Sequence, residues 1–199
     1  MILNLRKLQE EYSLNMKGVI HIGAHHGEEY EIYKNHNIKN LLFFEPNPEC
    51  FEVLKRNVKG IVINKALGNY TGKAKMYIAN NKGMSSSLLK PEVHKEQYSK
   101  ILFNKTMEVD IVKLDDILEN KEKYNFINIM AQGYELEVFK GAINTLENID
   151  YIMSGVYIDN VFKDCVQVKE LDNFLKDFNR VKTSWAGHTW GMAFYIRKK

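Results

Sequence analysis

The stretch FINIMAQGYELEVFKG (residues 126–141) joins two kinds of periodicity. Phe126 to Met130 is a mostly apolar run with the length of a buried strand, and apolar residues recur at helical spacing after Gln132-Gly133. A strand that runs directly into a helix is the repeating unit of an open α/β sheet, which binds ligands outside the carboxyl ends of its strands. Yet the residues at this strand end, Met130 and Ala131, do not titrate.

The same alternation continues on both sides of this stretch and predicts an α/β fold with a mostly parallel sheet and helices on both faces. A terminal strand pair joined by WAGHTWG is typical of a hairpin and makes one strand antiparallel. We expect strands at 18–23, 40–48, 60–68, 73–79, 125–130, 150–158, 180–185 and 191–197, helices at 28–37, 48–58, 134–147 and 167–177, and a strand leading into a short helix within 107–118.

Composition indicates an ordinary soluble protein. With 199 residues, 45% hydrophobic and 27% charged, we expect a single domain over 1–199 that begins with a helix at 1–16. We find no apolar run long enough for a membrane span and no apolar core of a signal peptide, and the two cysteines favour a reducing compartment, so we expect a cytoplasmic protein. The net charge of +3 is scattered, which disfavours nucleic acid as a partner, and nothing in the sequence fixes the oligomeric state.

The segment VIHIGAHHGEEY (19–30) follows a strand and opens a helix. Gly23 and Gly27 allow a tight turn and a close approach of the backbone to a ligand, although many plain strand-to-helix turns also contain two glycines. The dinucleotide fingerprint needs three glycines, so a nicotinamide-dependent enzyme is disfavoured.

An acid and an apolar pair follow the next two strands. Glu45 ends the second strand, where a carboxylate can accept the hydroxyls of a ribose, or alternatively cap the helix that begins near Pro48. Ala66 and Leu67 end the third strand and either contact an adenine ring or form a plain turn. Together with the glycine loop they favour an adenosine cofactor without a pyrophosphate, which S-adenosylmethionine satisfies.

These residues resemble the FkbM family of S-adenosylmethionine-dependent methyltransferases. The matching segments include GVIHIGAHHGEEYEIY, LLFFEPNPECFEVLKRN, VKLDDIL and QGYELEVFKGA, in family order over nearly the whole chain. The resemblance implies a Rossmann-like class I methyltransferase fold of seven strands, the last inserted antiparallel, and methyl transfer to an oxygen of a small molecule such as a sugar. It further implies that the cofactor is bound by Gly23, Ala24, His25, Gly27, Glu45, Pro46 and Asn47, with Ser86 and Ser87 near the cofactor or the acceptor.

The chain departs from the family at three acidic positions. Met130, Gly155 and Met192 stand where the resemblance leads us to expect acids, and we expect all three to face one pocket. Two methionines make such a pocket apolar and adaptable. The acceptor pocket is then expected to comprise Ser86, Ser87, Met130, Gln132, Gly155, Tyr157 and Met192.

Few residues remain for proton transfer. His188, in the WAGHTWG loop, is the candidate base, with His25 and His26 as alternatives. A metal cluster of His21, His25 and His26 is disfavoured because no nearby carboxylate completes it, so we expect no metal. Glu135 either caps the helix that it begins or reaches the site.

Two hypotheses therefore stand. The chain is a working small-molecule methyltransferase with an altered acceptor, or it is a cofactor-binding but catalytically impaired or engineered scaffold with a remade apolar pocket.

Overall fold

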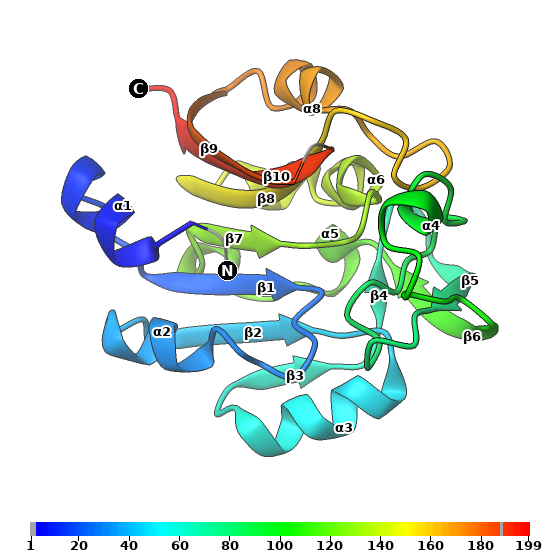
Figure 1. Ribbon diagram of the computed structural model, residues 1–199. Coiled ribbons are helices and arrows are strands. Elements are labelled where there is room, and N and C mark those ends of the chain that lie inside the picture. The colour runs from blue at the N-terminus through cyan, green and yellow to red at the C-terminus, as the bar shows by residue number, and fades with distance from the viewer. Residues whose placement is uncertain (1–2, 188) are drawn as a thin grey trace.

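The computed structural model describes residues 3–187 and 189–199 of the chain. At its centre lies a seven-stranded sheet of order β3-β2-β1-β7-β8-β10-β9 (Figure 1). Strand β10 pairs antiparallel with both neighbours and the remaining pairs are parallel, which confirms the predicted sheet. The strands are β1 (Gly18–Ile22), β2 (Asn40–Phe44), β3 (Ile61–Ile63), β7 (Phe126–Ile129), β8 (Tyr151–Tyr157), β9 (Phe178–Ala186) and β10 (Trp190–Arg197).

Alternate side chains of the sheet enter two different cores. Val19 packs with residues of three helices, α1 (Leu5–Tyr12), α2 (Tyr30–Asn35) and α3 (Pro48–Asn57). Its neighbour Ile20 packs with residues of α5 (Leu114–Ile117), α6 (Glu135–Lys140) and α8 (Val168–Phe174). Because successive residues of a strand point to opposite faces, a strand that is buried throughout requires helices on both sides of the sheet.

A second, three-stranded sheet of order β4-β6-β5 lies beyond the carboxyl ends of β1, β2 and β7 (Figure 1). It consists of β4 (Ala66–Leu67), β5 (Gly72–Ile78) and β6 (Lys105–Val112), and α4 (His94–Gln97) follows the loop after β5. The prediction of one strand over 60–68 is therefore wrong. The side-chain amide of Asn64 donates to the carbonyl oxygens of Glu45 (2.8 Å) and Pro46 (3.2 Å), and the chain leaves the large sheet at that point.

The predicted helix over 134–147 is divided into α6 and α7 (Ile143–Leu146). At Gly141 the chain passes so close to another loop that a Cβ atom would lie 1.9 Å from the carbonyl oxygen of Gly68. Asp115 then supplies the second helix with acceptors for the backbone N–H groups of Asn144 and Thr145, each at 2.8 Å.

The first helix is shorter than the predicted 1–16. Asn4 caps its N-terminus by accepting from the N–H of Lys7, and Ser13 ends it in the left-handed conformation. Within residues 3–187 and 189–199, no helix combines the length and the apolar character needed to cross a membrane.

Candidate functional site

The loop after β1 brings two strand ends into close contact. Gly23 has a φ of 72°, and a Cβ atom there would lie 2.2 Å from the carbonyl oxygen of Met130 at the end of β7. Only glycine allows this approach. Gly27 also has a positive φ, but a Cβ there would meet Val58 and Leu54 of the α3 region, so this glycine serves packing and lies outside both cavities described below.

Glu45 follows β2 and faces the same loop. Its Oε2 accepts from the N–H of His25 and its Oε1 from the N–H of Asn47, both at 2.8 Å. Burial raises the pKa of Glu45, and these two hydrogen bonds oppose the rise. Asn47, not Glu45, caps α3 by accepting from the N–H of Glu49, so Asn47 has a structural task outside the cavities.

A first cavity opens between this loop and the small sheet. It is lined mostly by apolar side chains, with a few polar groups from strand ends and loops. It combines one acidic end with an apolar slot. Of the predicted site residues, those that line it are Gly23, His25, Glu45, Pro46, Ala66, Leu67, Ser86, Ser87, Met130 and Gln132.

Several further residues of this cavity were not predicted. Met76 comes from the small sheet, Leu88 from the loop after it, and Tyr134 and Val138 from the region that starts α6. Their apolar spacing predicts only core positions, and it does not reveal that they line one cavity with Leu67. Ser87 fixes the loop against β7, since its hydroxyl donates to the carbonyl of Gln132 at 2.8 Å.

A second cavity adjoins the first. The two share five lining residues, and the second adds the predicted residues Ala24 and Met192. It also contains polar groups that sequence reasoning did not assign to it, including Glu28 and Glu29. The shared residues are Gly23, His25, Met84, Met130 and Gln132, and the further lining residues are His21, Glu28, Glu29, Asn128 and Trp190.

Gly155 does not line either cavity, which corrects the expectation that all three departures face one pocket. The side chain of Met130 covers it: a Cβ at Gly155 would lie 2.9 Å from Met130 Sδ and 2.9 Å from Glu135 Oε1. Met130 and Met192 do share the second cavity. The space above Gly155 is therefore already filled by a thioether.

Two buried polar side chains, Glu135 and Tyr157, lie close to Gly155 and outside the lining of both cavities. Glu135 accepts from the N–H of Ala131 at 2.9 Å through Oε1, while its Oε2 is buried with no hydrogen-bond partner among the described residues. Burial raises the pKa of Glu135 to about 7. Tyr157 is 1% exposed, and its hydroxyl has no hydrogen-bond partner within residues 3–187 and 189–199; burial, then the charge of Glu135, raise its pKa. The structure thus buries Tyr157 away from both cavities.

The candidate histidines separate into two groups. His188 lies outside the described residues. His21 is buried on β1, 3.3 Å from the hydroxyl of Tyr33 through Nδ1 and 3.4 Å from the amide of Asn128 through Nε2, and burial lowers its pKa. It is therefore not part of a cluster with His25 and His26.

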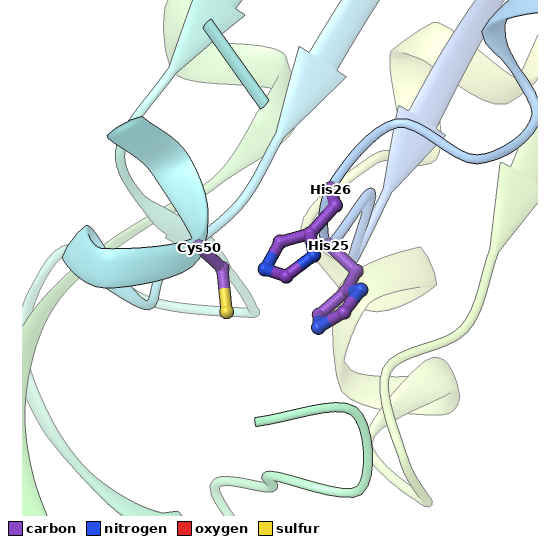
Figure 2. Close-up of side chains that lie close together, drawn as sticks. All are labelled: His25, His26 and Cys50. Carbon is purple, nitrogen blue, oxygen red and sulfur yellow. The ribbon is translucent and has the colours of Figure 1, made fainter. Parts of the chain in front are cut away.

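His25 and His26 instead face a cysteine. Their rings stack with centroids 3.8 Å apart, and Cys50 on α3 points toward them (Figure 2). The metal-binding atoms of the three side chains all lie within 4.8 Å of one another. Burial lowers the pKa of His26, and burial also raises that of Cys50 to about 12.

Comparison with known proteins adds a family to this geometry. The model of the methyltransferase FkbM domain matches residues 21–182. The hexuronic acid methyltransferase AglP of Haloferax volcanii is 26% identical over 123 residues, which are 59% of this chain and 47% of that protein. The chain thus spans about half the length of this curated relative.

Solved methyltransferases share the fold at low identity. The plantazolicin methyltransferase BpumL, solved with S-adenosylhomocysteine, has a TM-score of 0.56 and 10% identity over 97% of this chain and 81% of its own. A Streptococcus pneumoniae protein, Sp1610, described as a tRNA (m1A22) methyltransferase and solved with S-adenosylmethionine, has a TM-score of 0.53 and 12% identity over 99% and 73%. At these identities the likeness shows the fold alone.

Proposed function

Because the chain belongs to the family of the methyltransferase FkbM domain, we propose that it is an S-adenosylmethionine-dependent methyltransferase that methylates a hydroxyl of a small molecule such as a sugar. The observation that carries the proposal is the pair of adjoining cavities. They share Gly23, His25, Met84, Met130 and Gln132, so a donor in one and an acceptor in the other meet at the ends of β1 and β7.

The first cavity fits the cofactor by the chemistry of its ends. Glu45 uses one lone pair of each carboxylate oxygen for a backbone N–H and keeps others for ribose hydroxyls. Leu67, Leu88 and Met76 offer apolar surface for an adenine ring. Gly23 keeps the wall free of a side chain. The cofactor supplies an electrophilic methyl group on a sulfonium, and methyl transfer from it depends strongly on positioning.

The second cavity supports the acceptor side. A sugar hydroxyl needs a proton acceptor, and Glu29 is the group that we assign to this role. The Oε2 of Glu29 lies 4.0 Å from His21 Nε2. The side-chain amide of Asn128, on the neighbouring strand β7, contacts the same ring nitrogen at 3.4 Å. Among the described residues that line this cavity are two carboxylates and no lysine or arginine, which favours a neutral hydroxyl over an anionic acceptor.

The apolar part of the same cavity favours the alternative function. Met130, Met192 and Trp190 give this part of the cavity a soft apolar surface, and neither position 130 nor position 192 carries the acid that the family resemblance leads one to expect. In this second candidate function the chain binds the cofactor but transfers its methyl group poorly, or not at all.

Calorimetric titration with S-adenosylhomocysteine tests the first half of the proposal. Wild type is expected to bind, and Glu45→Gln is expected to weaken binding by about 10- to 100-fold, because hydrogen bonds to a charged group are worth roughly 1.5–3 kcal/mol. Glu52→Gln, which changes an exposed acid of α3, is the matched control and should bind as wild type does. No binding by folded wild type refutes the cofactor assignment.

Methyl transfer tests the second half. Labelled S-adenosylmethionine is incubated with neutral sugars and with hexuronic acids, on wild type and on Glu29→Gln. Transfer to a neutral sugar that falls about 10²–10⁴-fold in Glu29→Gln is the expected result for a lost base. Cofactor binding without transfer to any acceptor identifies the chain as the impaired binding protein.

A further inference from the structure

We propose that His25, His26 and Cys50 form a binding site for a thiophilic transition metal of the zinc class. Three donor atoms of the right chemistry lie within 4.8 Å of one another, at the junction between the glycine loop and α3. The inference concerns these residues alone and does not depend on the proposed methyl transfer.

The donor set selects the metal. Two imidazole nitrogens and one thiolate suit zinc, cobalt or copper(I), whereas magnesium and calcium require oxygen ligands. Zinc is bound at about 2.0–2.1 Å by nitrogen and about 2.3 Å by sulfur, so tetrahedral ligands lie roughly 3.3–3.8 Å apart. The present separations of up to 4.8 Å exceed this range, and the stacked rings of His25 and His26 must turn apart so that a nitrogen of each faces the ion.

Hydrogen bonds from neighbouring groups orient His25 in the way that metal-binding histidines are usually oriented. Nδ1 of His25 lies 2.7 Å from Glu28 Oε1, the arrangement in which a carboxylate fixes a metal-binding imidazole. The opposite nitrogen, Nε2, lies 2.9 Å from the carbonyl oxygen of Lys82, and the Cys50 thiol donates to that same oxygen at 3.5 Å. His25 Nε2 and Cys50 Sγ thus both lie against the same oxygen atom.

The backbone around the site is held firmly. His25 has a φ of 47°, and the carbonyl oxygen of His26 accepts from the side-chain amide of Asn57 at the end of α3 at 2.8 Å. A Cβ at Gly83 would lie 3.0 Å from Cys50 Sγ, so the loop that carries Lys82 covers the cysteine closely. These contacts hold the backbone that carries the three ligands before a metal binds, which reduces the entropy that metal binding must overcome.

Metal binding exchanges protons for the ion. The Cys50 thiol releases its proton to solvent as the metal bonds to sulfur, and each neutral imidazole binds through a ring nitrogen that carries no hydrogen. No electron is transferred, and a water molecule fills the fourth position.

The test uses reduced protein purified without a histidine tag and treated with chelator, titrated with Co²⁺ and with Zn²⁺. Co²⁺ reports the site directly, because thiolate coordination gives charge-transfer absorption in the near ultraviolet and tetrahedral geometry gives strong visible bands. We expect one equivalent with both signals. Cys50→Ser should remove the thiolate signal and weaken Zn²⁺ binding by more than about 100-fold, beyond the 10–100-fold typical of residues that only orient a ligand.

Cys165→Ser is the matched control, since Cys165 is the other buried free cysteine and should leave both signals intact. Circular dichroism verifies that each variant is folded, and His26→Gln repeats the test should Cys50→Ser fail to fold. Absence of thiolate absorption in wild type overturns the proposal, as does unchanged Zn²⁺ affinity in Cys50→Ser or in His26→Gln.

Discussion

Adding one methyl group at Gly155 tests the claim that Met130 has taken the space above it. The Gly155→Ala Cβ would lie 2.9 Å from Met130 Sδ, 3.5 Å from its Cε and 2.9 Å from Glu135 Oε1. Overpacking of this kind costs about 1–3 kcal/mol. For a chain of this length each kcal/mol lowers Tm by roughly 2–4 °C, so we expect a loss of about 2–12 °C.

The sharper measurement is the double variant. Met130→Ala removes the atoms that meet the new methyl group, so Gly155→Ala should cost less in the Met130→Ala background than in wild type. Contacting residues couple by about 0.5–3 kcal/mol, and urea denaturation of the four proteins gives this energy. Met84→Ala is the control background for the same measurement. Met84 also lines both cavities, but it is 59% exposed and is not among the nearest contacts of Gly155.

Full additivity of Gly155→Ala and Met130→Ala would refute this reasoning. A favourable coupling would show that Met130 and a side chain at 155 exclude each other. An acid at 155, where the family resemblance leads one to expect it, would moreover stand beside the buried Glu135 carboxylate.

Three further predictions follow from the same structure. Since burial raises the pKa of Glu135 from 4.5 to about 7, the folded state holds a proton that the unfolded state loses between these pH values, so this residue should lower the free energy of unfolding by about 3 kcal/mol as pH rises from 4.5 to 7. Urea denaturation across this range should show the decline in wild type and a flatter profile in Glu135→Gln, and equal profiles would contradict the assignment. Gly23→Ala should destabilise the fold by more than about 2 kcal/mol, because a left-handed φ costs roughly 1–2 kcal/mol before the clash with Met130 is counted, and a smaller change in thermal unfolding would disprove the close approach. Asn47→Ala should cost about 1 kcal/mol through the lost cap of α3, measured by urea denaturation, while a null effect would mean that the Asn47 cap contributes nothing to stability.

The large sheet could be predicted because each strand carries its own signal. Val19 and Ile20 are both apolar, and a strand buried on both faces needs no partner to be recognised. The small sheet could not, since GIVINKALG has the periodicity of one strand, and what divides it is the Asn64 amide bonding to carbonyl oxygens of another loop. Long-range hydrogen bonds of this kind leave no local pattern.

The candidate site was predictable to the same degree. Residues carried on the strand ends, such as Gly23, Glu45 and Met130, line the cavities where they were expected. Met76 and Leu88 were missed because they reach the cavity from the small sheet and its loop. Cys50 was overlooked as a metal ligand because its nearness to His25 and His26 arises from the packing of α3 and not from sequence spacing.

Strand β1 pairs with β2, which is close to it in sequence, and with β7, which is distant. Val19 lies opposite Leu41 on one side and opposite Phe126 on the other. On the ribosome, β2 and α3 are delivered long before β7, so the growing chain can assemble β3, β2 and β1 while one side of β1 still presents unpaired N–H and C=O groups. An interior strand of the finished sheet is thus an edge strand in every nascent chain that ends before Phe126, and edges of this kind attract chaperones or other nascent chains.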